Sequence, residues 1–375
     1  MDKIKIITIF GTRPEAIKMA PLVKELEKRE IIDVKVCVTA QHRQMLDQVL
    51  NLFNITPDFD LNIMKSKQSL TGITTRVLEG LEETFEIEKP DMVLVHGDTT
   101  TTFAGALAAF YKQIPLGHVE AGLRTFNKYF PFPEEMNRKL TGAMADLHFA
   151  PTISARDNLL RESVNEKNIY VTGNTVIDAM EYTVEDNYEF DNEELNNLDY
   201  RNKKVIMVTA HRRENWGEGI ENICKALKDI VEQNEDVELV YLVHLNPVVR
   251  DVVYKYLDGV QGVHLLPPLD TKETHNLMNK CFMVMTDSGG LQEEAPHLGK
   301  PVLVLRDVTE RPEAVAAKTV KLVGTDRDII IKEANELIRD EEKYSKMSKA
   351  INPYGDGLAS KRIVDIILQY FNKDN

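Results

Sequence analysis

The chain has 375 residues, of which 43% are hydrophobic and 28% charged, and its formal net charge is -14. This is the composition of an ordinary globular protein, and the length predicts two domains because one hydrophobic core rarely organises so many residues. The negative charge argues against a general nucleic-acid binder or a protein that binds membrane surfaces. Much of that charge is local, since residues 181–200 are rich in Asp and Glu and contain no Lys or Arg.

The three cysteines, Cys37, Cys224 and Cys281, are isolated in apolar segments and form no CxxC pair. This pattern predicts buried free thiols in a reducing compartment. The sequence opens directly on a strand-like segment without a signal peptide, and no apolar run approaches the ~20 residues that a membrane span requires. A cytoplasmic protein is therefore expected.

Short apolar runs alternate with helical patterns along most of the chain. Strands are predicted near residues 3–10, 33–39, 91–96, 115–119, 147–150, 169–172, 204–209, 238–243, 262–266, 282–286, 301–305 and 319–323. In the first half, helices are predicted near residues 15–29, 43–53, 70–87, 100–112, 134–145 and 152–163. Alternation of this kind gives α/β domains with doubly wound parallel sheets, in which loops at the carboxyl ends of the strands bind ligands.

Two Rossmann-like domains are expected from this pattern, with residues 1–172 in the first and residues 173–357 in the second. The acidic stretch 181–200 has little apolar periodicity and is interpreted as a surface connection just inside the second domain. A last helix lies within residues 358–375 and has an apolar face. It needs a surface to cover and is expected to return to the first domain.

One segment of the second half, Asp287–Pro301, begins with DSGG and stands between two apolar runs. Ser288 is positioned to cap a helix, and Gly289 and Gly290 would let a ligand approach backbone N–H groups at the positive end of the helix dipole. Glu294 lies one turn later and could reach a sugar hydroxyl. A phosphate site and an ordinary capped helix both account for this segment when it is taken alone.

Cationic residues follow predicted strands in both halves. Arg13 stands at the start of the helix after the first strand, with Lys18 about one turn along, so both could face an anion. Solvated charges beside a capped helix are the alternative for these two residues. In the second half His211, Arg212 and Arg213 follow a strand, and this grouping suggests a diphosphate site.

Three carboxylates are predicted to gather at one edge of the first sheet. Asp98 and Glu120 follow predicted strands, whereas Glu134 opens a helix in which Arg138 shares its face. Helix capping is the alternative for Asp98 and Glu134. Because grouped carboxylates repel one another, the pKa of at least one is expected to rise, as acid–base catalysis requires.

Several familiar motifs are missing from the sequence. Neither GxGxxG nor GxxxxGK[ST] occurs, which argues against an NAD-dependent enzyme and excludes a P-loop NTPase. HExxH is also absent, and the nine histidines show no metal-ligand spacing. No metal site is expected.

Taken together, these stretches resemble the non-hydrolysing UDP-N-acetylglucosamine 2-epimerases, over nearly the whole chain. The similar segments are GTRPEAIKMAP (11–21), HGDTTTT (96–102), HVEAGLRT (118–125), PEEMNR (133–138), TGNTVID (172–178), AHRREN (210–215), DSGGLQEEAP (287–296), RDVTERPE (306–313) and NPYGDG (352–357). The resemblance implies the GT-B architecture, in which two Rossmann-like domains face a cleft that holds the nucleotide sugar. It also implies a homodimer that works without an added cofactor.

The reaction implied by the resemblance interconverts UDP-N-acetylglucosamine and UDP-N-acetylmannosamine, and supplies N-acetylmannosamine-type sugars for cell-surface polysaccharide. UDP is eliminated to leave 2-acetamidoglucal and is then added back, with a proton delivered to the other face of C2. By matching position, the implied catalytic residues are Asp98, Glu120, Glu134 and His211. The implied UDP-binding residues are Arg13, Lys18, His211, Arg213, Ser288, Gly289, Gly290 and Glu294.

Bacterial members of the family are also similar in using a second substrate molecule as an activator. The residues at the matching positions are Gln41, Gln44, Lys67, Glu134, Arg212 and His244. Lys67 stands where an arginine is expected, and the loss of bidentate contact bears on the strength of this regulation. Phe130 and His297 replace two usual serines.

Other functions remain open at this point. A hydrolysing relative would release free N-acetylmannosamine together with UDP, whereas a glycosyltransferase of the same fold would need an acceptor and leave C2 untouched. A non-catalytic nucleotide-sugar sensor is a third possibility. Three carboxylates near one diphosphate argue against the sensor, because binding alone does not call for them.

Overall fold

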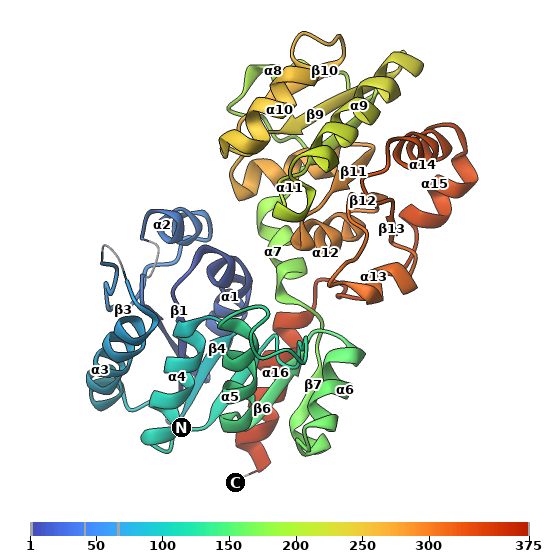
Figure 1. Ribbon diagram of the computed structural model, residues 1–375. Coiled ribbons are helices and arrows are strands. Elements are labelled where there is room, and N and C mark those ends of the chain that lie inside the picture. Colours follow the sequence, from blue (N-terminus) through green and yellow to red (C-terminus); the bar gives the residue numbers. More distant parts are fainter. Residues whose placement is uncertain (1–2, 41–42, 66–67, 374–375) are drawn as a thin grey trace. The chain divides into compact units, whose positions relative to one another are not determined.

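The computed structural model describes residues 3–40, 43–65 and 68–373, apart from the side chains of Gln44 and Lys373. The chain forms two compact units (Figure 1). The first unit runs to Tyr182 and resumes at Tyr354, and the second is Thr183–Pro353. The first unit thus extends ten residues beyond the boundary expected at residue 172, because the helix that follows this residue packs on the core of the first unit.

The first unit contains a seven-stranded parallel sheet in the order β3-β2-β1-β4-β5-β6-β7. Its strands are β1 (Ile4–Phe10), β2 (Ile32–Val38), β3 (Phe59–Asp60), β4 (Met92–His96), β5 (Leu116–Val119), β6 (Leu147–Ala150) and β7 (Ile169–Val171). The doubly wound arrangement confirms the expected fold. Only the two-residue β3 was not predicted.

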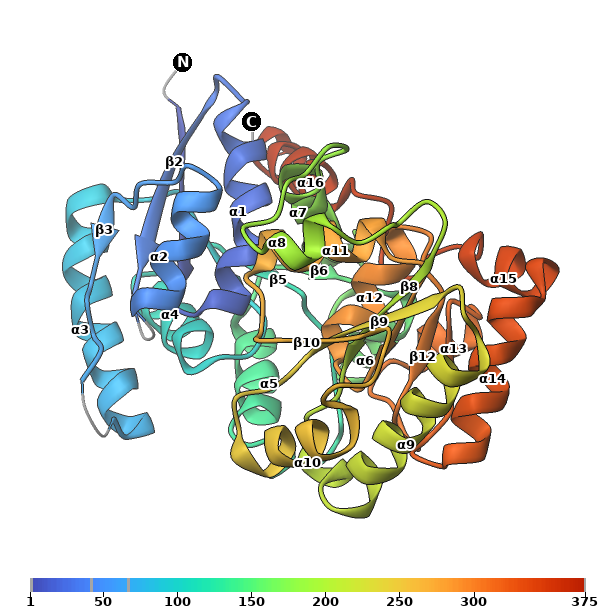
Figure 2. The ribbon, with the colours of Figure 1, turned by 90° about the horizontal axis from the view of Figure 1, so that it is seen from above.

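Helices cover both faces of this sheet, because its central strands bury both sets of alternating side chains. In β1, Ile6 and Phe10 join the core on one face, and Ile7 and Ile9 join the core on the other. The helices are α1 (Arg13–Glu27), α2 (Arg43–Leu52), α3 (Leu70–Glu88), α4 (Thr100–Tyr111), α5 (Glu134–Met144), α6 (Ile153–Arg161), α7 (Thr175–Thr183) and α16 (Ala359–Lys373). The C-terminal α16 lies beside α1, as Figure 2 shows.

The second unit contains a six-stranded parallel sheet in the order β10-β9-β8-β11-β12-β13. Its strands are β8 (Lys204–Thr209), β9 (Val237–Leu242), β10 (Val263–Leu266), β11 (Met283–Thr286), β12 (Val302–Val304) and β13 (Val320–Leu322). Its helices are α8 (Glu193–Asn196), α9 (Glu218–Gln233), α10 (Pro247–Leu257), α11 (Thr271–Lys280), α12 (Gly289–His297), α13 (Pro312–Ala316), α14 (Arg327–Arg339) and α15 (Glu341–Ser348). Both units therefore have the predicted α/β class.

The acidic stretch 181–200 is more ordered than its composition indicates. It contains the short helix α8, and its apolar residues Phe190 and Leu195 are buried. The three cysteines are free and buried, and burial raises the pKa of each to about 12. Across residues 3–40, 43–65 and 68–373, none of the helices has the length and apolarity needed to cross a membrane.

One buried carboxylate joins two loops at the carboxyl edge of the first sheet. Glu15, in the first turn of α1, is 2% exposed, and its Oε2 accepts hydrogen bonds from the backbone N–H groups of Gly11 and Thr12 at 3.0 and 2.8 Å. Its Oε1 accepts a 2.6 Å hydrogen bond from the hydroxyl of Thr99, in the loop after β4. Because β1 and β4 are neighbours in the sheet, this side chain fastens the loops of both strands.

Replacing Glu15 with Ala would remove the acceptor of two buried backbone N–H groups and of the hydroxyls of Thr12, Thr99 and Thr102. We expect the free energy of unfolding to fall by about 3 kcal/mol, since each buried unsatisfied group costs roughly 1–3 kcal/mol. Urea denaturation followed by circular dichroism measures this loss as a lower midpoint. Glu83→Ala makes the same change on an exposed position of α3 and should shift the free energy by less than about 0.5 kcal/mol. Equal midpoints for the two variants would contradict the role given to Glu15.

Candidate functional site

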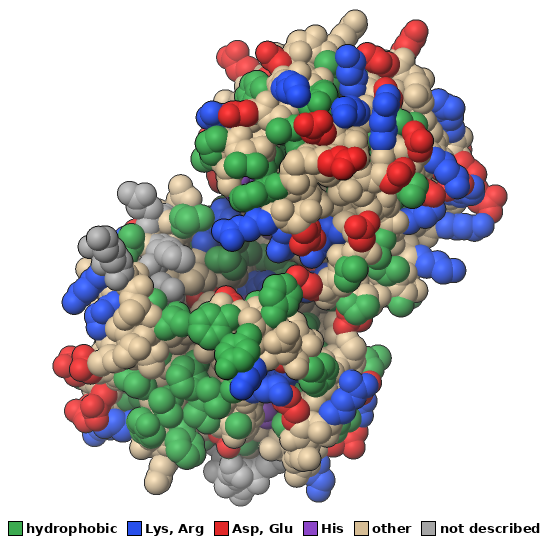
Figure 3. Space-filling view, viewed as in Figure 1, with side chains coloured by type: hydrophobic (Ala, Val, Ile, Leu, Met, Phe, Trp, Pro, Cys, Tyr) green, Lys and Arg blue, Asp and Glu red, His purple; other side chains and the backbone are tan. Residues whose placement is uncertain are grey.

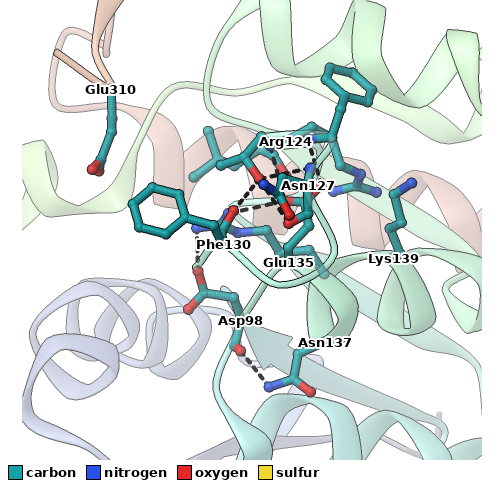
Figure 4. Close-up of polar contacts among 12 residues, drawn as sticks. Asp98, Arg124, Asn127, Phe130, Glu135, Asn137, Lys139 and Glu310 are labelled. Carbon is teal, nitrogen blue, oxygen red and sulfur yellow. Dashed lines mark hydrogen bonds and ion pairs between the residues drawn. The ribbon is translucent and has the colours of Figure 1, made fainter. Parts of the chain in front are cut away.

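The three carboxylates singled out in the first half lie at the same edge of the first sheet. Asp98 follows β4, and Glu120 comes directly after the adjacent β5. Glu134 is the first residue of α5, whose Arg138 pairs with the Asp98 carboxylate at 2.6 Å. The side-chain amide of Asn137, also on α5, donates to the Asp98 carbonyl at 2.8 Å (Figure 4). These two contacts tie the helix that begins with Glu134 to the loop that carries Asp98.

Glu120 is a buried carboxylate with basic side chains around it. Its side chain is 9% exposed and forms an ion pair with Lys18, and the Nε2 atom of His96 lies 3.0 Å from the same carboxylate oxygen. Burial pushes the pKa of Glu120 upward, but Lys18 and His96 outweigh it and hold the pKa well below its usual value. The pKa rise expected for at least one of the grouped carboxylates does not occur at Glu120, because a lysine pairs with it.

The backbone at Glu120 supports a functional interpretation. Its φ of +61° lies in the left-handed region, which is uncommon for a residue other than glycine. Conformations of this kind carry a strain that the surrounding structure must hold, and they cluster at functional sites.

The two cations expected near an anion take different positions. Lys18, on α1, is engaged by Glu120. Arg13 is the first residue of α1, and its Nε is buried with no hydrogen-bond partner among the described residues. Both lie at the carboxyl edge that carries Glu120.

The two adjacent glutamates at the start of α5 have different surroundings. Glu135 is fully buried and accepts hydrogen bonds from backbone N–H groups of the loop at residues 125–126. Arg138, which follows Glu134 by four residues on the same helix, pairs with Glu135 at 3.4 Å and with Asp98. The Oε2 atom of Glu134 is buried and has no hydrogen-bond partner within the described segments. Glu135 therefore holds the loop, while Glu134 has an oxygen that is not used by the fold.

His96 was not singled out from the sequence as a site residue, although it belongs to HGDTTTT. It is 4% exposed at the end of β4, and the signal for it is a polar residue that ends a buried strand. His118 is also buried, and its Nε2 lies 2.8 Å from the carbonyl of Gly97. Burial lowers the pKa of His118 to about 3, so this ring is neutral and serves the fold.

In the second unit, a buried carboxylate holds the turn that contains His211. The Oδ2 atom of Asp287 accepts hydrogen bonds from the backbone N–H groups of His211 and Arg212, both at 2.8 Å, and from the amide of Asn215 at 3.1 Å. The imidazole rings of His211 and His244 stack, with centroids 5.1 Å apart. Burial lowers the pKa of His211, Asp287 opposes this shift, and His244 and Arg212 reinforce it.

The start of α12 is open to an anion. Ser288 occupies the N-cap position but its side chain makes no capping hydrogen bond, so the expected capping role is wrong. A Cβ added at Gly289 would lie 3.9 Å from the guanidinium of Arg311 and 4.0 Å from that of Arg212. Two guanidinium groups therefore meet bare backbone at the positive end of a helix, which is a favourable arrangement for phosphate.

Arg311 was not predicted as a site residue, although it belongs to the segment RDVTERPE. Its guanidinium also pairs with Glu293 on α12. Glu294 lies where it was expected, since a Cβ at Gly290 would come within 3.2 Å of its Oε1. Its Oε2 is 3.5 Å from Nε2 of the buried His275, another residue that the sequence did not suggest.

Four further candidates are Arg213, Gln41, Gln44 and Lys67. Arg213 is exposed, and its guanidinium lies over the ring of Trp216 at 5.9 Å. Gln41 and Lys67 fall outside the described residues, and so does the side chain of Gln44, whose backbone belongs to α2. No group of three or more His, Cys, Asp or Glu side chains that could hold a metal ion occurs within the part of the chain that the structure describes.

Comparison with known proteins identifies the family. Residues 24–368 match the family described as UDP-N-acetylglucosamine 2-epimerase. A protein of Clostridium acetobutylicum is 78% identical over 99% of this chain and 96% of its own length. The UDP-N-acetylglucosamine 2-epimerase of Bacillus subtilis is 60% identical over 99% of this chain and 97% of its own.

Solved structures agree with this result. The UDP-GlcNAc 2-epimerase of Neisseria meningitidis, crystallised with UDP-GlcNAc bound, superposes with a TM-score of 0.84 at 52% identity and covers 97% of this chain and 100% of its own. The glycosyltransferase of kitacinnamycin shares the fold alone, with a TM-score of 0.66 at 12% identity over 97% of this chain and 98% of its own. The chain thus belongs to the UDP-N-acetylglucosamine 2-epimerase family.

Proposed function

We propose that this protein interconverts UDP-N-acetylglucosamine and UDP-N-acetylmannosamine at C2 without hydrolysing either sugar nucleotide. The observation that carries the proposal is the grouping of Asp98, Glu120 and Glu134 at one sheet edge, with Glu120 held ionised by Lys18. Relatives that share half or more of the sequence have been crystallised with UDP-GlcNAc or with UDP. Family membership and the carboxylate grouping point to the same chemistry.

The second unit would bind the UDP moiety. The open N-terminus of α12 at Ser288, Gly289 and Gly290 offers N–H groups to the phosphates, and Arg311 and Arg212 supply positive charge close to Gly289. Glu294 would accept hydrogen bonds from ribose hydroxyls. In the first unit, Arg13 would contribute a further cation, since its buried Nε has no partner among the described groups.

Catalysis would proceed by elimination and re-addition, because the C2 hydrogen has no neighbouring carbonyl to make it acidic. A carboxylate takes the C2 proton, the C–H electron pair forms the C1–C2 double bond, and the C1–O electron pair leaves with UDP. The intermediate is 2-acetamidoglucal. Return of UDP oxygen to C1, with a proton delivered to the opposite face of C2, gives the epimer.

The carboxylates suit this chemistry by their surroundings. Lys18 and His96 hold the pKa of Glu120 well below its usual value, so its side chain is in the carboxylate form that accepts a proton, and burial keeps water away from it. Glu134 has a buried oxygen that is not used by the fold, and Asp98 is oriented by Arg138. Oriented N–H groups and cations stabilise the departing diphosphate, which keeps UDP bound for re-addition.

We also propose the regulation and assembly implied by the family resemblance. A second substrate molecule acting as an activator would contact Arg212 and His244, whose ring stacks on His211, together with Gln41, Gln44 and Lys67.

A homodimer would cover apolar side chains that gather over α4 and α5 (Figure 3), where Phe110 and Tyr111 are 59% and 67% exposed. Light scattering that finds only monomers would contradict the dimer.

Incubation with UDP-N-acetylglucosamine in D2O tests the proposed reaction directly. Proton NMR should show UDP-N-acetylmannosamine with deuterium at C2, since the proton removed from C2 exchanges with solvent before one is returned. Accumulation of UDP and free N-acetylmannosamine would indicate a hydrolysing enzyme instead. Turnover that needs an acceptor and leaves C2 unlabelled would indicate a glycosyltransferase, and binding without turnover would indicate a sensor.

The pair formed by Lys18 and Glu120 makes the pH dependence of turnover predictable. In Lys18→Met, burial of Glu120 is no longer opposed by the lysine, so its pKa should rise and the base should protonate at a higher pH. We expect the acidic limb of the kcat/KM profile to move toward neutral pH. Lys18→Arg keeps the positive charge and serves as the matched control, with a smaller shift. Coincident acidic limbs for Lys18→Met and the parent would show that Lys18 does not set this ionisation.

A further inference from the structure

The buried carboxylate beside His211 has one oxygen that the fold leaves unpaired. Asp287 is 0% exposed, and its Oδ2 accepts the three hydrogen bonds that hold the turn of His211. Its Oδ1 is equally buried but has no hydrogen-bond partner among the described residues. That oxygen lies 3.5 Å from Nδ1 of His211, just beyond hydrogen-bond distance.

A buried carboxylate oxygen without a donor is costly, so a small movement of the imidazole that closes this gap would be favourable. A hydrogen bond from the His211 Nδ1–H to Oδ1 would leave Nε2 on the far side of the ring, pointing away from Asp287. A carboxylate in this position selects the Nδ1–H tautomer and stabilises an imidazolium, as the aspartate does in Ser-His-Asp triads.

We propose that Asp287 is a positioning residue that holds His211 as an imidazolium, so that Nε2–H acts as the acid for the departing diphosphate. The inference rests on the proposed function. As the C1–O bond breaks, its electron pair goes to the phosphate oxygen, and the Nε2 proton moves to that oxygen. When the oxygen attacks C1 again, the proton returns to Nε2, so His211 is unchanged after each turnover.

The charged groups facing His211 determine when its imidazole becomes protonated. Asp287, after β11, favours the imidazolium, whereas His244, after β9, and the neighbouring Arg212 disfavour it, in the same direction as burial. A bound diphosphate adds negative charge and so favours the imidazolium form. Substrate binding should therefore protonate His211, which makes the acid available only when a leaving group is present.

Titration of His211 in the unmodified protein is the first test. With histidine labelled in ¹³C and ¹⁵N, NMR should show the pKa of His211 rising on addition of UDP-N-acetylglucosamine, with the proton on Nδ1 retained throughout. A pKa that stays where it is, or a neutral ring protonated only on Nε2, would overturn the inference. So would a failure of the sugar nucleotide to bind.

Asp287→Asn is the matching variant. The amide oxygen can replace Oδ2 and keep the turn, but the NH2 group then faces Nδ1 and donates to it, which places the only ring proton on Nε2. Neutral imidazole is too weak an acid to transfer that proton, so kcat should fall on the order of 100-fold, in the range typical of a lost general acid. The KM should change far less than kcat, because the phosphate contacts remain.

Asp326→Asn provides the control. Asp326 caps α14 by accepting from the backbone N–H of Ile329 at 3.0 Å, a role that Asn fills equally well, so kcat and the His211 titration should match the parent. An Asp287→Asn protein with parental kcat would overturn the inference, whatever its stability. If the pKa of His211 does not rise on substrate binding but epimerisation is intact, only the proposed role of Asp287 and His211 is rejected. If the pKa rises as expected but no epimerisation occurs, only the proposed function is rejected.

Discussion

Each of the two units has a carboxylate buried at the ends of two neighbouring strands. In the first unit Glu15 binds backbone N–H groups after β1 and a hydroxyl after β4. In the second unit Asp287, after β11, binds backbone N–H groups after β8. The two strand pairs occupy equivalent central places in their sheets, β1 beside β4 and β8 beside β11, where the winding of a parallel sheet changes direction.

Loops at these positions expose N–H groups that no strand can satisfy, and a buried carboxylate is a strong acceptor for them. Once the loops are fastened, the side chains that they carry become preorganised. Glu15 thereby places Arg13 and the loop of Asp98, and Asp287 places His211 and Arg212. These polar groups are oriented during folding and need not reorganise during the reaction. Electrostatic stabilisation accelerates chemistry under this condition.

The two units differ in the sign of the charge that they concentrate. The first gathers carboxylates and keeps Glu120 ionised through Lys18, which suits proton transfer at carbon. The second gathers guanidinium groups around a glycine at a helix N-terminus, which suits a diphosphate. The proposed elimination of UDP needs both functions, because a base without a stabilised leaving group would return the proton unchanged.

The strands could be predicted to within one or two residues because buried parallel strands appear as uninterrupted apolar runs. The two-residue β3 is too short to leave such a pattern, and the first unit continues past residue 172 to Tyr182 because α7 packs on its core. Sequence motifs pointed to Asp98, Glu120 and Glu134, but the lowered pKa of Glu120 depends on Lys18, which lies more than a hundred residues earlier.

The sequence shows His96 at the end of a buried strand and Arg311 within a motif, but their roles, like that of Glu15, depend on partners from a different loop or helix. Ser288 illustrates the opposite error. Its residue type and position predict a capping hydrogen bond, yet the structure makes none, and the hydroxyl is not used by its own helix. Local propensity identifies where the helix starts, whereas only the tertiary structure shows which polar side chains form hydrogen bonds within the protein.

In the proposed division of labour, the first unit performs the chemistry while the second retains UDP. Calorimetric measurement of UDP affinity in two variants tests this division most directly. Glu134→Gln should abolish turnover and leave the dissociation constant of UDP close to the parental value, whereas Arg311→Met should weaken UDP binding by roughly 10-fold or more, as expected for a charge-assisted contact worth about 1.5–3 kcal/mol. Equal loss of UDP affinity in both variants would contradict the claim.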